Sequence, residues 1–239
     1  SAFGFYCSLF CALLLSVFYT VLSAPLLKIL GANSTTVAAT AEYLKWTVSF
    51  GAVPSILNVV LAYLVRSEGS SLNAGIGTMS GCLLNILLDP LFILPDFLNM
   101  GAAGAGLATF ISNCVACIYF FIFLFVKRQK TYVCINPKKL KFNKAIVSGV
   151  CIVGIPAAIQ NLLNVTGMTV INNFTSSFGS DAVAAMGIAQ KINMVPMYIA
   201  LGFSQRIMPL IGYNYASKNN ERMKKTVTFS AKLSVIFID

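Results

Sequence analysis

The sequence predicts an all-α integral membrane protein, built as a multi-helix bundle that crosses the bilayer. Hydrophobic residues make up 57% of the 239 positions and charged residues only 10%, whereas soluble domains carry about 25% charged residues. The mean hydropathy is +0.81. Apolar runs of about 20 residues or more, the length that a membrane helix needs, follow one another along the chain.

Four of these runs precede residue 127 and predict the first four membrane helices. They cover residues 2–27, 46–65, 72–94 and 102–126. Pro54 lies inside the second run, and because proline removes a helical hydrogen bond we expect a kink there. The third run is the least apolar, and its glycines (Gly75, Gly77 and Gly81) permit a neighbouring helix to approach closely.

A basic linker, residues 127–144, follows the fourth run. It holds seven of the 17 Lys and Arg residues and no acid. Short loops rich in Lys and Arg stay on the cytoplasmic side of a membrane. A nucleic-acid-binding patch would need a soluble domain around it, and the flanking apolar runs exclude one. We therefore expect three parts: residues 1–126, the linker 127–144, and residues 145–239.

Two further helices are predicted at residues 145–174 and 182–211, and another begins near Thr226. The sequence Gly154-Ile155-Pro156 is expected to break the first of them early, with a bend near Ile152–Pro156. Because the chain opens and closes inside apolar runs, we expect it to be a piece of a longer protein.

The basic residues predict the orientation in the plasma (inner) membrane. Alternating the sides from the linker places residues 66–71, 127–144 and 212–225 in the cytoplasm, and residues 28–45 and 96–99 outside. Thirteen of the 17 basic residues then lie at cytoplasmic loops or helix ends, against two in the outer loops. This asymmetry is the signal that sets topology.

Amide side chains gather on the helix predicted at residues 145–174. Polar groups inside a bilayer cost free energy and so mark functional surfaces. Asn161, Asn164, Met168 and Asn172 recur at spacings of three or four and share one helical face, with Gln160 at its edge. We predict that this face binds substrate in a wet cavity. Hydrogen bonding to neighbouring helices is the alternative.

The next helix, at residues 182–211, adds Gln190, Lys191 and Met194 as candidate substrate-binding residues. Flexible methionines suit a surface that accepts many shapes, and they equally suit packing against lipid. Lys191 either extends to the membrane interface or faces the cavity, whereas Arg206 is expected to reach the interface.

Asn85 and Asp89, in the helix predicted at residues 72–94, are assigned a structural role, as are Pro54 and Pro156. Asp89 is followed at once by Pro90. We expect its carboxylate to accept a hydrogen bond or to cap the backbone near Pro90 rather than to bind a coupling ion.

No cofactor or metal site is predicted. The chain has seven Cys and no His. Cys114 and Cys117 form a mid-helix C-x-x-C without a second pair, which we interpret as small packing residues rather than as a redox or zinc site. The tripeptide Asn33-Ser34-Thr35 matches a glycosylation sequon in a predicted outer loop.

Six short segments, in order along the chain, resemble successive signatures of the multidrug and toxic compound extrusion (MATE) transporters. They are residues 66–69 (RSEG), 85–93 (NILLDPLFI), 101–109 (GAAGAGLAT), 154–156 (GIP), 184–189 (AAMGIA) and 209–215 (PLIGYNY).

The resemblance implies a twelve-helix protein of two six-helix lobes. This chain would hold helices three to six, the inter-lobe linker, helices seven and eight, and the start of helix nine. Family members exchange Na⁺ or H⁺ for organic, often cationic, compounds. The implied partners are the lipid bilayer, small organic substrates and the other half of the same chain.

Two departures limit what the resemblance implies. Asn164 stands where many members have a glutamate, eight residues after the proline of G-x-P. An amide cannot take up a proton, so the coupling ion is expected to bind outside this chain. Residues 215–217 (YAS) stand where glycine is frequent in the family.

A secondary-active exporter that works by alternating access is the leading functional hypothesis. A lipid-linked oligosaccharide flippase of related fold is the first alternative, because Lys191 would favour an anionic substrate. A membrane-embedded enzyme would need convergent acids, histidines or a metal site, and Asp89 is the only acid well inside a predicted span. A purely structural subunit would leave the amide face without a function.

Overall fold

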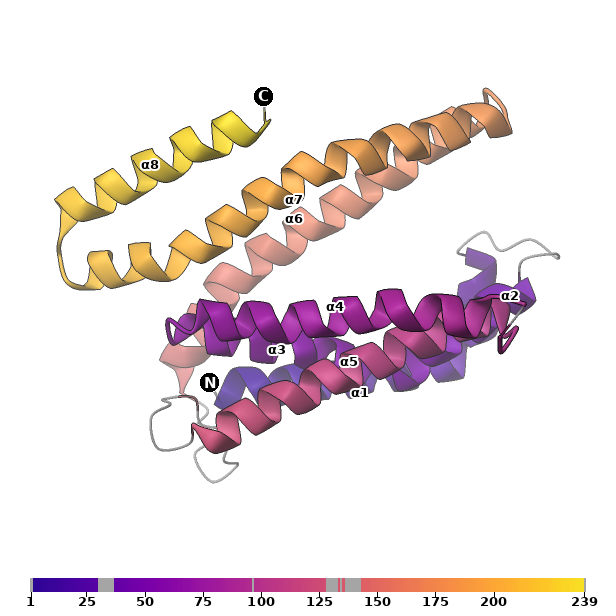
Figure 1. The fold of residues 1–239 in the computed structure, drawn as a ribbon, viewed down its shortest axis with the longest axis horizontal. Helices are drawn as coiled ribbons and strands as arrows, with labels where there is room; N and C mark the ends of the chain where they lie inside the picture. Colours follow the sequence, from indigo (N-terminus) through magenta and orange to yellow (C-terminus); the bar gives the residue numbers. More distant parts are fainter. Residues whose placement is uncertain are drawn as a thin grey trace. The chain divides into compact units, whose positions relative to one another are not determined.

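The computed structural model describes residues 2–29, 37–95, 97–127, 133, 135 and 143–238. Every regular element among these residues is a helix (Figure 1). The chain divides into two units, Ser1–Lys141 and Phe142–Asp239, which we describe separately. The linker predicted at residues 127–144 lies largely outside the described residues, so its exact limits stay a prediction.

The first unit is a bundle in which α3 packs against α1, α4 and α5 (Figure 1). Its elements are α1 (Ala2–Ile29), α2 (Val37–Leu44), the π-helix η1 (Lys45–Phe50), α3 (Ala52–Ser67), α4 (Ser71–Ile93) and α5 (Gly101–Val126). Inside α1 the backbone leaves helical geometry at Leu22, with φ −106° and ψ 21°. The cause is Pro25, which cannot donate a hydrogen bond to the preceding turn.

The glycines of α4 allow α5 to approach closely, as the sequence predicts. A β-carbon at Gly77 would lie 2.5 Å from the ring of Phe120, and one at Gly81 would lie 3.1 Å from the β-carbon of Ala116. Lipid tails are as apolar as these side chains, so association depends on close packing rather than on the hydrophobic effect.

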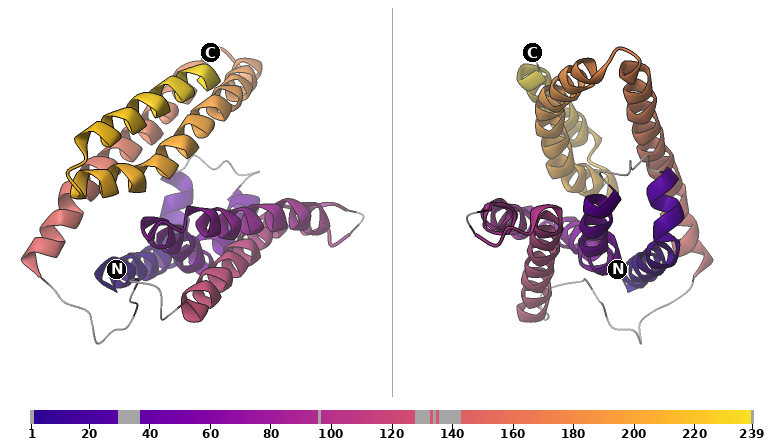
Figure 2. Two further views of the ribbon diagram at one scale, coloured as in Figure 1. Left: turned by 60° about the vertical axis from the view of Figure 1, so that its left-hand side comes forward. Right: turned by 90° about the vertical axis from the view of Figure 1, so that its right-hand side faces the viewer.

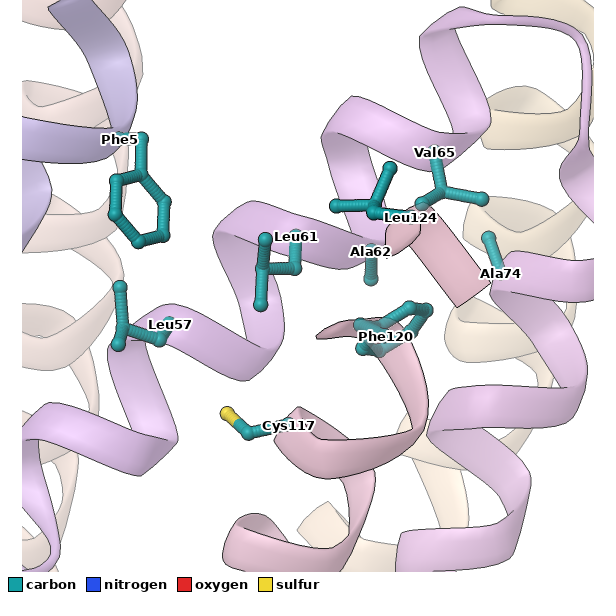
Figure 3. Packing of buried hydrophobic residues seen from close by; sticks show 9 residues of the cluster. All are labelled: Phe5, Leu57, Leu61, Ala62, Val65, Ala74, Cys117, Phe120 and Leu124. Atoms are coloured by element: carbon teal, nitrogen blue, oxygen red, sulfur yellow. The ribbon is translucent and has the colours of Figure 1, made fainter. Parts of the chain in front are cut away.

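The core of the first unit lies at the end of the bundle where α1 begins and α3 ends. Phe120 of α5 is 0% exposed and lies near Ala62 of α3 and Ala74 of α4 (Figure 3). The cluster comprises Phe5, Leu57, Leu61, Ala62, Val65, Ala74, Cys117, Phe120 and Leu124. This packing joins four helices that are distant in sequence.

The predicted kink in the second span exists, but it lies at Gly51 rather than at Pro54. The helices on either side of Gly51 differ in direction by 53°. Pro54 falls in the first turn of α3, where backbone N–H groups have few intrahelical partners and proline is well tolerated. The bend requires glycine at position 51, because the β-carbon of any other residue would lie 2.6 Å from the carbonyl oxygens of Trp46 and Thr47.

The segment predicted as an outer loop, residues 28–45, is not all loop, because α2 occupies residues 37–44. Its place outside the membrane stays a prediction. The sequence of α2, VAATAEYL, is rich in good helix formers. α2 packs on α5 at Gly106, where a β-carbon would lie 2.8 Å from the carbonyl oxygen of Tyr43. The sequon Asn33-Ser34-Thr35 and Asp96 of the second outer loop lie outside the described residues.

The second unit consists of three long helices, α6 (Lys144–Ser176), α7 (Ser180–Ala216) and α8 (Asn220–Ile238). Asn143 begins α6 as its N-cap, with Oδ1 accepting the N–H of Ala145 at 3.0 Å. The predicted break at Gly154-Ile155-Pro156 is wrong, because α6 continues through Pro156. A single proline removes one hydrogen bond, which a membrane helix tolerates. The bend near this proline stays a prediction.

The loop predicted at residues 212–225 is only three residues long in the structure, where it joins α7 to α8. Lys218 adopts a left-handed φ of 56°, and the N–H of Asn219 then bonds the carbonyl of Asn214 at 2.9 Å, which ends α7. The Asn219 side chain accepts the N–H of Arg222 at 3.1 Å and so caps α8.

Five helices are long and apolar enough to cross a membrane, and the bent pair on either side of Gly51 would make a sixth span among the described residues. They match the six predicted spans. α8 turns back along α7 (Figure 1, Figure 2).

Thiol labelling tests the predicted orientation. Cysteines introduced at Lys138 and Lys218 should react with a membrane-impermeant maleimide only from the cytoplasmic side, and one introduced at Asn99 only from outside. The reason is the excess of basic residues around the first two positions. Labelling of the Lys138→Cys variant in intact cells would show that the predicted orientation is wrong.

Candidate functional site

The predicted substrate-binding face lies on one unbroken helix. Because α6 is continuous, spacings of three and four residues keep Asn161, Asn164, Met168 and Asn172 on one side of it. Met168 is half-buried, whereas the three asparagines and Gln160 are exposed. Within the second unit, α6 diverges from α7 away from their connecting turn (Figure 2).

Hydrogen bonding separates these amides into two kinds. Asn161 donates to the carbonyl of Ala157 in its own helix at 3.0 Å, as Thr166 does to Leu162 at 2.8 Å. Asn164 and Asn172 form no hydrogen bond with any residue that the structure describes. Two amides thus remain available on a single helical face.

The candidates on α7 lie at a comparable distance from the α6–α7 turn. Lys191 is 11 residues from the start of α7 and Asn164 is 12 residues from the end of α6, or about 17 Å along each helix at 1.5 Å per residue. Lys191 is exposed, and Gln190 and Met194 are half-buried. No hydrogen bond joins these three residues to α6 in the described part of the chain, so no polar contact links the two sets there.

Asn85 and Asp89 lie one helical turn apart on α4. The Asn85 amide donates to the Asp89 carboxylate at 3.4 Å, a long hydrogen bond. Asp89 is half-buried, and α4 continues through Pro90 to Ile93. The carboxylate therefore accepts the expected hydrogen bond, while the helix at Pro90 is not broken and needs no cap.

Sequence reasoning missed a cavity of about 460 Å³ between α1, α2 and η1, whose lining is mostly apolar with a few polar groups. Hydroxyl groups dominate its polar lining, and Lys45 supplies a positive charge. Its lining residues are Tyr19, Thr20, Ser23, Leu27, Ala41, Lys45, Ser49 and Phe50. Ser16, Thr20 and Ser23 recur at helical spacing inside an apolar run, a signal that could have revealed this surface.

A second missed feature is a chain of amides between α3 and α5. Asn58 donates to the side chain of Asn113 at 3.0 Å, and Asn113 donates to the carbonyl of Thr109 at 2.9 Å. Cys117 adds a hydrogen bond from its thiol to the carbonyl of Pro54 at 3.1 Å. These contacts, and its place in the core, make Cys117 a packing residue.

Residues 2–91 and 156–238 match the sequence model of the MatE family. The chain belongs to the MatE family. Two relatives are multidrug export proteins named MepA. That of Staphylococcus haemolyticus (strain JCSC1435) is 35% identical over 240 residues, covering 99% of this chain and 51% of the relative. That of Staphylococcus aureus (strain bovine RF122 / ET3-1) is 36% identical over 241 residues, covering 100% and 52%.

The fold is also similar to a solved structure of a multidrug resistance MATE family transporter of the MOP superfamily in its outward-facing conformation. The TM-score is 0.88 at 26% identity, covering 99% of this chain and 52% of that one. The chain thus spans about half the length of the relatives it matches. Membership of the MatE family makes it a multi-pass membrane protein of a transporter family, not of an enzyme family.

Family membership leaves the role of Asp89 to experiment. We predict that Asp89→Asn lowers the free energy of unfolding by at most about 1 kcal/mol, because asparagine keeps an oxygen acceptor for Asn85 and loses only the charge that strengthens this hydrogen bond. The ion dependence of residual transport should not change. Thermal unfolding in detergent and transport at varied Na⁺ and pH would measure both.

Asn85→Ala is the matched control, since it removes the donor and keeps the charge. If Asp89→Asn folds normally and loses its ion dependence, the coupling ion binds at this carboxylate. The assigned structural role would then be wrong.

Proposed function

We propose that the complete protein is a secondary-active exporter of small organic compounds, driven by exchange for Na⁺ or H⁺ through alternating access. The two MepA relatives are named as multidrug export proteins, and this supports export rather than lipid flipping. In transporters of this kind the substrate site lies near the middle of the bilayer between two repeats.

The observation that carries the proposal is the amide face of α6. Asn164 and Asn172 sit inside a helix with the length and composition of a membrane span, yet they bond to none of the described residues. An amide left without a partner in hydrocarbon costs free energy. We infer that these amides face a wet cavity, where they meet water and substrate. Gln160, Asn161 and Met168 would complete this wall.

Neutral amides suit broad recognition. Each can donate and accept hydrogen bonds without selecting for substrate charge. Half-buried Met194 and Met168 add flexible, polarizable side chains that adapt to different shapes. Gln190 and Lys191 are proposed as contributions of α7. The coupling ion is proposed to bind outside this chain, because Asn164 cannot ionise.

Replacing both Asn164 and Asn172 with leucine should raise the KM for a transported cationic dye roughly tenfold, since two substrate hydrogen bonds are lost. The ion-to-substrate stoichiometry should stay constant. Dye uptake into inverted vesicles, driven by an imposed Na⁺ or H⁺ gradient, measures both quantities. Membrane insertion should not suffer, because the swap removes polar groups from hydrocarbon.

Thr166→Val is the matched control. It lies on another face of α6, and its hydroxyl already bonds the carbonyl of Leu162, so its KM should match that of the unmodified protein. Normal transport by the double leucine variant would show that the amides only pack against other helices. Absence of gradient-driven uptake of any cation in the unmodified protein would contradict the exporter.

A further inference from the structure

Two residues of the basic linker, Val133 and Ile135, are fixed to the first unit. The carboxylate of Glu68, in the turn between α3 and α4, accepts the backbone N–H of Val133 at 2.7 Å. The hydroxyl of Tyr6, on α1, donates to the backbone carbonyl of Ile135 at 2.8 Å. The bond to the carboxylate is charge-assisted, which makes it the stronger of the two.

Apolar contacts hold the same two residues. The side chains of Val133 and Ile135 are half-buried against the core cluster around Phe120, at the end of the bundle drawn in Figure 3. Tyr6 and Phe123 belong to the same half-buried layer. Backbone hydrogen bonds and apolar burial therefore act on one short segment, as they do when an extended peptide occupies a prepared site.

The receiving surface is built from a motif without another role in the proposed function. Residues 66–69 (RSEG) close α3: Ser67 bonds the carbonyl of Leu64 at 2.8 Å, and Gly69 turns the chain with a φ of 80°. Glu68 is half-buried between them. It places a negative charge at the surface that receives a linker with seven basic residues and no acid.

We propose that the end of the first unit carries a docking site for the chain's own inter-unit segment, with Glu68 and Tyr6 as the residues that hold it. Val133 and Ile135 then move with the first unit throughout the transport cycle. The segment that connects the units shortens from the 16 steps between Lys127 and Asn143 to the eight between Ile135 and Asn143. Its greatest reach falls from about 58 Å to about 29 Å.

This shorter reach limits how far the two units can separate at the cytoplasmic side. That consequence rests on the proposed alternating-access function, whereas the docking itself does not. The docking can therefore be tested without any transport measurement.

Hydrogen–deuterium exchange of the full-length protein in detergent tests the docking, with overlapping peptides that resolve the Val133 amide. In the unmodified protein this amide should exchange slowly, with and without tetraphenylphosphonium as a substrate probe. Glu68→Ala should speed its exchange about tenfold or more, because a hydrogen bond to a charged group is lost. Glu68→Gln keeps an oxygen acceptor and should have a smaller effect.

Tyr6→Phe removes only one hydroxyl, so it tests the second attachment without disturbing the turn at Glu68. It should speed exchange near Ile135 by a smaller factor, and the combination with Glu68→Ala should exceed either variant alone. Glu221→Ala is the control, since this exposed acid pairs with Lys225 on α8 at 2.8 Å. Fast exchange at Val133 in the unmodified protein, or unchanged exchange in both Glu68→Ala and Tyr6→Phe, would overturn the docking site.

Discussion

Replacing Phe120 with alanine should destabilise the first unit by about 3 kcal/mol, near the lower end of the range for a buried phenylalanine. The ring is 0% exposed and contacts side chains of α3 and α4 in the core (Figure 3). The loss comes from packing, because the surrounding bilayer is as apolar as the core. Thermal unfolding in detergent and the yield of inserted protein would measure it.

Phe125→Ala is the matched control on the same helix. Its ring is 76% exposed, so the change should alter stability by less than about 0.5 kcal/mol. Equal losses for the two variants would show that the core does not depend on the Phe120 ring.

The contact between Gly77 and Phe120 adds a sharper test. Gly77→Ala alone forces its new methyl group against the ring, at a cost of about 1–3 kcal/mol. In the Phe120→Ala background this ring is absent and the methyl group partly fills the space, although the ring of Tyr119 still lies 2.7 Å from the new β-carbon. The double variant should therefore be more stable than the sum of the single effects predicts. Strict additivity would mean that α4 and α5 are further apart than described.

Replacing Gly51 with alanine should have the second large effect, a loss of about 2–3 kcal/mol in stability. The new β-carbon would lie 2.6 Å from two backbone carbonyl oxygens, of Trp46 and Thr47. Backbone atoms cannot turn away as a side chain can, so the 53° bend itself has to change. Thermal unfolding in detergent measures the loss.

Gly4→Ala is the control for this substitution, because a β-carbon at Gly4 meets nothing within 4 Å in the described structure. It should be neutral or slightly stabilising, since alanine favours helix over glycine. A Gly51→Ala variant as stable as Gly4→Ala would show that the bend does not require glycine.

Much of the fold could be predicted from local sequence. Apolar runs of about 20 residues can satisfy their backbone hydrogen bonds in a bilayer only as helices, and the six predicted spans are present. The predicted helix boundaries were wrong where the local sequence patterns conflicted with the contacts of the folded chain. Residues 220–225 are strongly polar, yet they form the first turns of α8 because Asn219 caps them and Glu221 pairs with Lys225.

The candidate site was predicted only as a helical face. The spacing of Asn161, Asn164 and Asn172 depends on helix geometry alone, so the sequence was sufficient to place them together. Whether an amide bonds its own helix or remains available depends on side-chain conformation. Asn161 bonds Ala157, whereas Asn164 and Asn172 bond no described residue, and spacing does not distinguish these cases.

The sequence by itself determined the class of this protein: its helical spans, its basic linker and the motifs of a transporter family. These follow from composition and short-range order. Long apolar runs satisfy their backbone hydrogen bonds in a bilayer by forming helices, and basic loops stay on the cytoplasmic side. Only the tertiary structure decided the bend at Gly51, the amide link between Asn58 and Asn113, and the docking of Val133 on Glu68. Each joins elements by a close approach between particular atoms, up to 65 residues apart in the last case, and no local pattern specifies which distant groups will meet.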